Sequence, residues 1–308
     1  MHAWEAIQKS VDYIEAHLRE DVSAEMLAEM VSLSPFYFQR LFKRLTGKTV
    51  QEYVKLRRLA RVIDELNTDG QRILDTALDY GFSGHANFTR AFKEAYGITP
   101  EEYKKTRPML NTFLKPDLSW NYVLIDEGMP LIIEDIVLEI RRETLDAAET
   151  YIGFTADVPI AAQTPVGEAT GIDLPGQLWT RFHNEKQALA PYVNPSAELG
   201  MSYMADPKNG IFQYFAGALL RDTPDCAADF VTRELPAGDY IVCRIEAENF
   251  EKLVTEALDK AGKYLFGTWL PNHQLTSEPF SAEKYDRNCD CGNCVEIWVK
   301  ALSAMTYN

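Results

Sequence analysis

A stretch of twenty residues occurs twice in this chain, fifty positions apart and without a gap. Residues 38–57 and 88–107 agree at ten positions. The identical pairs are Phe38/Phe88, Arg40/Arg90, Phe42/Phe92, Lys43/Lys93, Gly47/Gly97, Thr49/Thr99, Glu52/Glu102, Tyr53/Tyr103, Lys55/Lys105 and Arg57/Arg107. Identity on this scale indicates a true internal repeat. The first hundred residues must therefore build one local fold twice.

Each copy predicts a short helix, a tight turn and a second helix. In the first copy the short helix is expected over residues 23–31, and the second starts after the N-cap Ser34, with Pro35 in its first turn, and ends at Gly47. The matching elements of the second copy are expected over residues 72–80, 81–84 and 85–96. This is the helix-turn-helix arrangement, whose second helix enters the major groove of DNA.

Two further helices complete this first region. Apolar residues at helical spacing predict a helix over residues 4–19, and residues 50–66 predict a long helix that joins the two copies. A helix of that length spans roughly 25 Å. With its flanking turns it can place two recognition helices in successive major grooves, which lie about 34 Å apart. One chain is thus expected to read two groove segments.

The side chains divide each recognition helix into two faces. A stripe of phenylalanines is expected to be buried, namely Phe38, Phe42, Phe88 and Phe92. The residues expected to contact DNA are Phe36, Gln39, Arg40, Lys43, His85, Asn87, Arg90 and Lys93. Gln and Asn pair with adenine edges, and Arg pairs with guanine edges or phosphate. Residues 36–62 carry eight Lys or Arg against one acidic residue. The duplicated pattern favours DNA binding over a merely solvated basic face.

Residues 1–108 resemble the AraC/XylS-type DNA-binding domain. The residues that carry the resemblance are Ala77, Gly81-Phe82, Phe88, Arg90, Phe92-Lys93, Gly97, Thr99-Pro100 and Tyr103. The resemblance implies an all-α domain of two helix-turn-helix units joined by one long helix. Two positions depart from the family pattern, because Gly84 replaces the usual Ser or Asp cap and Ala86 replaces a polar residue. The base preference of the second unit is therefore left open.

Charge is divided unevenly along the chain. The net charge is −15 over 308 residues, yet residues 1–108 hold sixteen basic and sixteen acidic side chains. Residues 109–308 carry all of the net negative charge. Such a region repels phosphate and attracts cations at long range. Only the first region is suited to DNA, and the second is suited to a cationic partner.

The chain shows no transmembrane or secretion signal. No apolar run reaches membrane-spanning length, and Met1 leads directly into an amphipathic pattern. An odd count of five cysteines fits a reducing compartment. We therefore expect a cytoplasmic protein that has no membrane partner.

Residues 109–134 are expected to form a linker, because Pro116, Gly128 and Pro130 interrupt any regular pattern. Residues 135–308 then predict an α+β domain. The expected strands are 135–142, 150–156, 200–205, 211–219, 229–235, 240–246, 281–285 and 294–302, with helices near 174–182 and over 250–265. The order strand, strand, helix, strand, strand occurs twice. We therefore predict a multi-domain chain whose second domain, residues 135–308, has two similar halves.

Residues 135–308 resemble the GyrI-like effector-binding domain. The resemblance rests on Leu235-Pro236-Ala237-Gly238-Asp239-Tyr240, Trp269-Leu270-Pro271, Glu283-Lys284-Tyr285 and Val295-Glu296-Ile297-Trp298. It implies a groove between the two halves that holds a ligand, often a lipophilic cation, near a buried Glu. Glu283 and Glu296 fall on the acidic positions of that groove. Some members of the family act as small hydrolases instead.

The predicted effector site joins these carboxylates to aromatic rings. Residues two apart on a strand face the same side, so Glu283 lies beside Tyr285 and Glu296 beside Trp298. A carboxylate next to a π-face suits a flat organic cation. The full set of predicted effector contacts is Trp179, Trp269, Glu283, Tyr285, Glu296 and Trp298. The alternative is an exposed strand face with solvated charges.

A cysteine-rich loop, Cys289-Asp290-Cys291-Gly292-Asn293-Cys294, is the one candidate for a metal site. A structural zinc site needs four ligands, and the fourth would have to be Cys226, Cys243 or His273. A redox-sensing disulfide and a loop of reduced thiols are the alternatives. The spacing is not that of paired zinc ligands, so we predict no metal and no cofactor.

Motifs of common enzymes are absent, including the P-loop, G-x-S-x-G and H-E-x-x-H. We therefore predict a bacterial transcription regulator rather than an enzyme. Its partners are double-stranded promoter DNA, a small-molecule effector and, if it is an activator, RNA polymerase. The alternatives are a regulator whose second domain is a small-molecule hydrolase, through a Glu acting as general base, or a protein-docking module.

Overall fold

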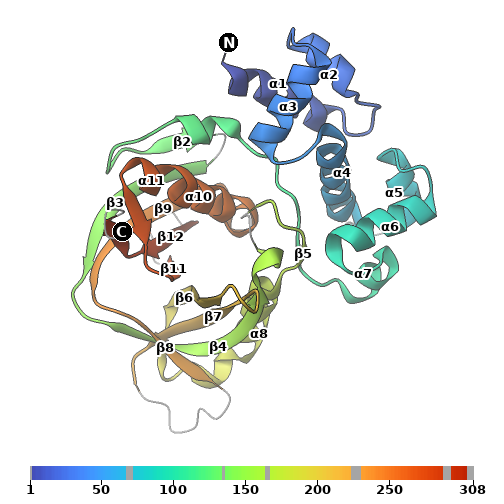
Figure 1. The fold of residues 1–308 in the computed structure, drawn as a ribbon. Helices are drawn as coiled ribbons and strands as arrows, with labels where there is room; N and C mark the ends of the chain where they lie inside the picture. The colour runs from blue at the N-terminus through green and yellow to red at the C-terminus, as the bar shows by residue number, and fades with distance from the viewer. Residues whose placement is uncertain are drawn as a thin grey trace. The chain divides into compact units, whose positions relative to one another are not determined.

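A computed structural model describes residues 2–66, 72–133, 136–163, 167–222, 230–286 and 293–303 (Figure 1). By its internal contacts the chain forms two compact units. The first contains residues 1–123 and a short later segment, residues 168–172. The second contains residues 124–167 and 173–308. None of the helices in the described part of the chain has the length and apolarity needed to cross a membrane.

The first unit is helical. Its helices are α1 (Ala3–Ala16), α2 (Ala24–Met30), α3 (Pro35–Thr46), α4 (Val50–Leu66), α5 (Ile73–Asp79), α6 (His85–Tyr96) and α7 (Pro100–Thr106). Helices α2 and α3 form one helix-turn-helix, α5 and α6 form the other, and α4 joins them. The predicted fold of this region is confirmed.

Local capping sets the helix ends. The Ser34 side chain accepts a hydrogen bond from the backbone N–H of Tyr37, and Pro35 occupies the first turn of α3. Gly47 ends α3 with a left-handed backbone, φ 74°, and Gly97 ends α6 in the same way. The repeated phenylalanines Phe38, Phe42, Phe88 and Phe92 are all fully buried. The repeat therefore encodes two equivalent cores.

The segment that follows α7 also packs within the first unit. Strand β1 (Leu110–Asn111) pairs with β5 (Gly171–Ile172), and the 3-10 helix η1 spans Leu118–Tyr122. Phe113 is buried against the ring of Tyr53, with ring centroids 5.5 Å apart. Much of the segment predicted as a linker thus has defined contacts within the first unit.

The second unit is built on one antiparallel sheet of nine strands. Its order is β2 (Leu131–Ile133), β3 (Ile136–Leu145), β9 (Gly238–Ala247), β12 (Cys294–Val299), β11 (Ser281–Asp286), β6 (Val193–Asp206), β7 (Ile211–Leu220), β4 (Glu149–Pro159) and β8 (Val231–Leu235). Strands β10 (Leu275–Ser277) and β13 (Ala301–Ser303) form a separate pair. The predicted α+β class is confirmed.

The two halves of this sheet exchange their first strands. Strand β3 opens the first half but pairs with β9 of the second. Strand β8 opens the second half but pairs with β4 of the first. The halves meet where β6 pairs with β11. This central seam is therefore a junction between the third strands of the two halves.

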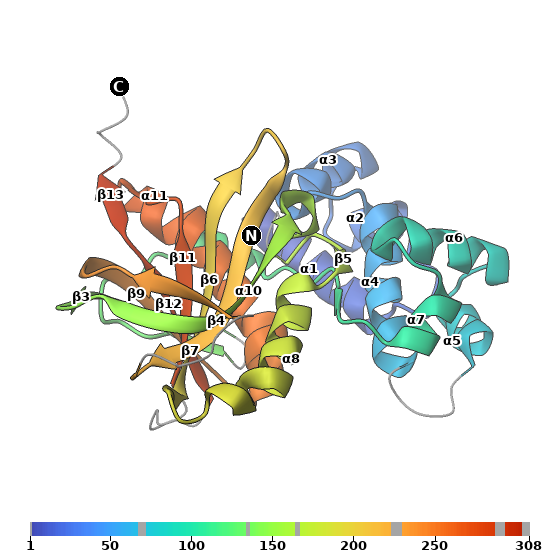
Figure 2. The ribbon, with the colours of Figure 1, turned by 90° about the horizontal axis from the view of Figure 1, so that it is seen from below.

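Helices cover one face of the sheet on both sides of the seam. They are α8 (Leu174–Glu185), α9 (Phe250–Lys252), α10 (Leu258–Tyr264) and α11 (Leu270–Asn272), with short helical turns at Ile160–Ala162 and Lys186–Leu189 and π-helical turns at Leu253–Ala257 and Leu265–Trp269. Leu178 and Phe182 of α8 pack against Phe154 and Ala216 of the sheet. Figure 2 shows α8 and α10 on the same side of the strands. Side chains of β6 and β11 that point to the helical face of the sheet therefore lie on the side covered by α8 and α10.

Candidate functional site

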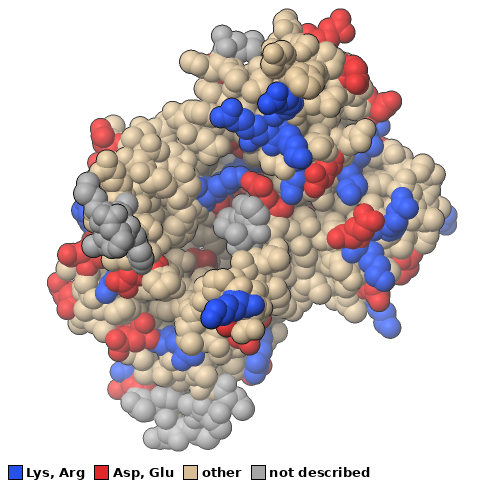
Figure 3. All heavy atoms as spheres, in the orientation of Figure 1, with Lys and Arg blue, Asp and Glu red and all other residues tan. Residues whose placement is uncertain are grey.

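The predicted DNA contacts of α3 lie on the exposed side of the helix. Phe36 is 65% exposed, and Gln39, Arg40 and Lys43 are also exposed. The Arg40 guanidinium lies over the Phe36 ring, 5.5 Å from its centroid. In the described part of the chain, Gln39 and Lys43 form no side-chain hydrogen bond or ion pair. Figure 3 shows Lys and Arg side chains gathered around α3. These groups are available to an external partner.

The predicted contacts of α6 are exposed as well, but two of them already have partners. His85 Nε2 lies 2.7 Å from Glu101 Oε1, and Asn87 Nδ2 donates to Ser83 Oγ at 2.8 Å. The cap position holds Gly84, which supplies no side-chain cap. Arg90 and Lys93 point outward on the exposed face. The two recognition helices thus share a backbone arrangement. They differ in which of their polar side chains already have a partner within the protein.

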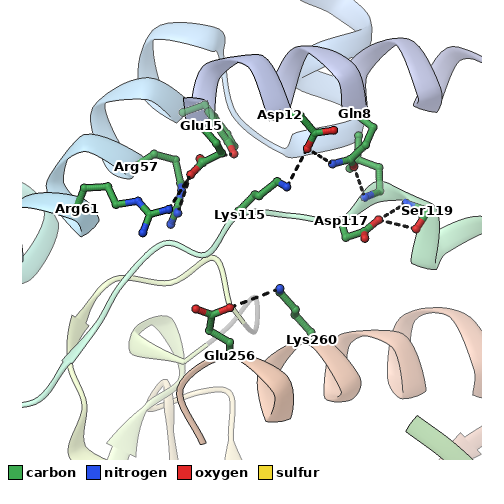
Figure 4. A network of polar contacts seen from close by, with 12 residues as sticks. Gln8, Asp12, Glu15, Arg57, Arg61, Lys115, Asp117, Ser119, Glu256 and Lys260 are labelled. Carbon is green, nitrogen blue, oxygen red and sulfur yellow. Dashed lines mark hydrogen bonds and ion pairs between the residues drawn. The ribbon is translucent and has the colours of Figure 1, made fainter. Parts of the chain in front are cut away.

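The basic segment 36–62 is not a single DNA-facing surface. Arg57 of α4 is buried and forms an ion pair with Glu15 of α1, 2.7 Å from Nε to Oε1 (Figure 4). It also donates to the carbonyl of Phe113. Arg58 donates to the carbonyls of Leu18 and Glu20. These two arginines hold helices together, so the cationic surface is smaller than the residue count suggested.

In the second unit, the seam of the sheet carries the candidate effector site. Glu283 on β11 accepts hydrogen bonds from Tyr214 Oη at 2.9 Å and Tyr285 Oη at 3.0 Å. The indole N–H of Trp179, on α8, donates to Tyr214 at 3.0 Å. The rings of Trp179 and Tyr285 meet edge to face, 5.2 Å apart. The structure therefore brings two predicted aromatic residues, Trp179 and Tyr285, together with the predicted carboxylate of Glu283.

Gly200 on β6 makes room for this network. It pairs directly with Glu283 across the seam. A Cβ at this position would lie 2.3 Å from Tyr214 Oη and 2.9 Å from Glu283 Oε2. Both distances are too short for any side chain, so the close approach of the phenol and the carboxylate requires glycine. Figure 3 shows a recess in the surface of the second unit.

Among the residues that the structure describes, no cationic side chain pairs with the carboxylate of Glu283. Burial raises its pKa, the two phenol hydrogen bonds oppose the rise, and the charge of Asp173 adds to it. Glu198, on the same sheet face, is a useful contrast because it binds Lys186 Nζ at 2.6 Å and His183 Nε2 at 3.0 Å. Burial opposes ionisation of Glu198 too, but these partners hold its pKa below the usual value. Within the described ranges, Glu283 thus lacks the kind of counter-charge that Glu198 has.

Glu296 and Trp298 do not belong to this site. Glu283 pairs with Ile297, whereas Glu296 pairs with Lys284, so the two carboxylates lie on opposite faces of the sheet. Glu296 forms an ion pair with Arg141 at 2.6 Å and accepts the indole N–H of Trp298 at 2.9 Å. The hypothesis of two neighbouring, mutually repelling carboxylates is therefore wrong, because a one-residue step in strand register separates them.

The side-chain contacts described for Trp269 do not include Glu283. It is fully buried, donates its indole N–H to the carbonyl of Ile125 at 3.0 Å, and stacks on His273 at 3.9 Å. In this structure Trp269 packs in the core of the second unit. The ligand contact that the resemblance implies for Trp269 stays a prediction.

The cysteine loop falls mostly outside the described residues. Cys289 and Cys291 are among those not described, and so is Cys226. Cys294 begins β12 and is disulfide-bonded. Cys243 is a free, buried thiol whose pKa burial raises to about 12. In the described ranges no group of His, Cys, Asp and Glu side chains is arranged to hold a metal ion. The predictions for the other cysteines of the loop lie outside the described residues.

Sequence reasoning missed several residues of the site. Tyr214 and Gly200 contact Glu283. The charge of Asp173 adds to the raised pKa of Glu283, and the charge of Glu283 adds to the raised pKa of Asp259. Tyr214 and Gly200 come from β7 and β6, which pair with each other and with β11. Only the order of strands in the sheet brings them to Glu283. No local motif marks any of the four.

Comparison with known proteins agrees with this architecture. A helix-turn-helix domain family matches residues 27–106, and the GyrI-like small molecule binding domain family matches residues 142–301. The transcriptional regulator YbfP of Bacillus subtilis is 39% identical over 104 residues, which are 34% of this chain and 35% of that protein. The regulatory protein SoxS of Salmonella typhimurium is 32% identical over 98 residues, 32% of this chain and 92% of SoxS.

A solved structure titled "The structure of SAV2435 bound to tetraphenylphosphonium" covers 55% of this chain and 98% of that one, with 17% identity and a TM-score of 0.41. The GyrI-like match alone spans more than half of the chain. The chain therefore belongs to the AraC-type helix-turn-helix family and carries a C-terminal GyrI-like small-molecule-binding domain.

Proposed function

We propose that this chain is a transcription regulator that binds promoter DNA through α3 and α6. The carrying observation is the duplicated helix-turn-helix whose recognition helices expose Gln39, Arg40, Lys43, Arg90 and Lys93. Buried phenylalanines fix both helices, so these outward side chains are held at defined positions. Relatives such as SoxS are named as regulatory proteins, which supports a regulator over an enzyme. A cytoplasmic location follows from this role.

We further propose that the second unit binds a flat, lipophilic cation at Glu283. The carboxylate is partly buried, accepts two phenol hydrogen bonds and faces the rings of Trp179 and Tyr285. A cation would supply the missing counter-charge, and the rings would contact its apolar faces. Occupancy of this site would then change DNA binding, and RNA polymerase would be a further partner if the chain is an activator.

Matched ligands test the effector site. N-methyl-4-phenylpyridinium and 4-phenylpyridine share a biaryl shape and differ in charge at pH 8. Tryptophan fluorescence titration should show tighter binding of the cation, and Glu283→Gln should weaken the cation at least about tenfold while changing the neutral molecule little. Glu296→Gln is the control, since Glu296 lies on the other sheet face beside Arg141. Equal affinities for both molecules, unchanged in Glu283→Gln, would refute the cation site.

A further inference from the structure

A short segment of the chain belongs to a different unit from the residues on either side of it. Glu168–Ile172 packs within the first unit, whereas Leu124–Gly167 and Asp173–Asn308 form the second. Each residue of this segment is half-buried. The chain therefore crosses between the units on both sides of the segment, in addition to the crossing after Val123.

This segment contacts both recognition helices of the first unit. At its start, Glu168 lies beside the C-terminus of α3, where a Cβ on Gly47 would be 3.2 Å from Glu168 Oε2. At its end, strand β5 contacts α6. Strand β5 also pairs with β1, where Ile172 faces Leu110, and Leu110 packs against the core of the first unit. A change in how this segment is held therefore reaches both α3 and α6.

The end of the segment runs directly into the helix that carries Trp179 of the effector site. Only Asp173 separates Ile172 from α8, and Asp173 caps that helix by accepting the backbone N–H of Gly176 at 3.0 Å. One intervening residue leaves little slack. A movement of α8 therefore acts on β5 rather than being absorbed in a loop.

A ligand at the proposed cation site acts on α8. The rings of Trp179 and Tyr285 already meet edge to face, with centroids 5.2 Å apart, and Trp179 donates to Tyr214 at 3.0 Å. A flat ligand that stacks on both rings must part them. Tyr285 stands on β11, which is paired on both sides, with β6 and with β12. The sheet is the fixed side of the site, so α8 is the element that moves.

The pairing of β5 with β1 is well suited to open in response. Each strand contributes only two residues, and an isolated pair of strands is marginally stable. The paired and released forms therefore differ little in free energy. A ligand that favours one position of α8 can shift the balance between them.

We propose that Glu168–Ile172 is the coupling segment of this regulator. A cation at Glu283 displaces α8, draws β5 from β1 and so alters how α3 and α6 bind DNA. The inference rests on the proposed cation site and adds the route by which its occupancy changes DNA binding. The coupling is reciprocal, so bound DNA must change the affinity for the cation by the same factor.

A flexible insertion tests this route. Gly-Ser-Gly-Ser placed between Ile172 and Asp173 keeps β5 and the cap of α8, but it lets α8 move without drawing on β5. The matched control carries the same insertion between Val123 and Leu124, at a different crossing between the units. Both variants loosen a connection, and only the first interrupts the proposed route.

The first readout is DNA affinity of the full chain with and without saturating N-methyl-4-phenylpyridinium. Fluorescence anisotropy is measured on a duplex selected from a random library with the wild type. In the wild type and the Val123 insertion variant the dissociation constant should change at least about fivefold, and in the Ile172 insertion variant by less than about twofold. Isothermal titration calorimetry of the cation with and without the duplex should give the same factors.

Hydrogen exchange is the second readout, because it reports on the pairing itself. The cation should speed exchange of the β1 and β5 amides in the wild type and leave it unchanged in the Ile172 insertion variant. This measurement decides the matter if that variant fails to bind the cation. Unchanged exchange of β1 and β5 in the cation-bound wild type would overturn the inference.

Coupling that survives the insertion after Ile172, or that is lost equally in both insertion variants, would also overturn the inference. The same holds if the wild type binds DNA and, in a Glu283-dependent way, the cation, yet neither changes the affinity for the other. The proposed cation site would then stand alone. If the wild type does not bind the cation, both proposals fail.

Discussion

The two helix-turn-helix units use the same framework for different surfaces. Both bury the same phenylalanines, and both recognition helices end in a left-handed glycine, Gly47 or Gly97. In the first helix-turn-helix, Gln39 and Lys43 of α3 have no side-chain hydrogen bond or ion pair among the described residues, and Gln39 stands where the second helix-turn-helix has the half-buried Thr89. In the second helix-turn-helix, Glu101 and Ser83 already bind the side chains of His85 and Asn87 at the start of α6. We therefore expect α3 to read bases and α6 mainly to anchor on the DNA backbone.

The arginine that ends each repeat shows that identity does not imply a common role. Arg57 is buried in an ion pair with Glu15, whereas Arg107 is exposed and donates to the carbonyl of Leu66. Replacing Arg57 by Met removes the closest cationic partner of buried Glu15, which keeps only Arg61 at 3.7 Å and the Tyr53 hydroxyl at 3.1 Å, and should destabilise the first unit by about 3 kcal/mol. Arg107→Met should cost about 1 kcal/mol. The stability losses of both variants can be measured by urea unfolding and by hydrogen exchange of the α4 amides.

The double variant Glu15→Gln/Arg57→Met is the control for that comparison. It removes the orphaned charge, so it should be more stable than Arg57→Met alone. Equal losses for the two arginine variants would show that the buried pair does not distinguish the repeats.

Arg40 and Arg90 provide the matched pair for DNA binding. Arg40→Ala should weaken binding to a specific site by about 1–3 kcal/mol and relax its sequence preference, as expected of a base contact. Arg90→Ala should weaken binding to all sequences alike and lower the salt slope by about one, as expected of a phosphate contact. Fluorescence anisotropy over a range of salt concentrations separates the two. If instead Arg90→Ala relaxed the sequence preference and Arg40→Ala weakened binding to all sequences alike, α6 would read bases and α3 would contact the backbone.

Helix capping should also differ between the units. Ser34→Ala removes the cap of α3 and should cost about 1 kcal/mol of stability. Ser83→Ala removes only a side-chain bond to exposed Asn87 and should cost about 0.5 kcal/mol or less. Urea denaturation of both variants is the measurement. A larger loss for Ser83 would mean that the second turn has a cap of its own.

The smallest expected effect concerns Glu101, which faces His85 at the start of α6. Glu101→Gln removes a negative charge from the proposed DNA-facing surface, so DNA affinity should rise by a few tenths of a kcal/mol, roughly, and more at low salt. Glu251→Gln, an exposed change on α9 of the second unit, is the control for net charge. Identical gains in DNA affinity for the two variants would show that Glu101 is not part of the DNA-facing surface.

Local features of this chain could be predicted from the sequence. The cap at Ser34, the glycines that end α3 and α6, and the bounds of α4 depend on neighbouring residues, and the structure places them as expected. The long-range features could not. Glu296 meets Arg141, which is 155 positions away, and no local pattern shows which sheet face Glu296 occupies.

Strand exchange between the two halves is the main reason for that failure. The sequence predicts two similar halves, but only long-range pairing decides that β3 joins β9 and that β6 meets β11. Tyr214 and Gly200 reach Glu283 through that seam. The carboxylate and its aromatic neighbours on α8 and β11 could be predicted as a group, while their true partners could not.

Selection of bound duplexes from a random library, with the full chain, tests most directly the claim that α3 reads bases in a sequence-specific regulator. We predict that the wild type enriches a defined sequence. Arg40→Ala should lose the sequence preference over part of that site, and Arg90→Ala should keep all of it at lower affinity. Recovery of sequences no different from the input library would contradict the account, and so would equal loss of preference in both variants.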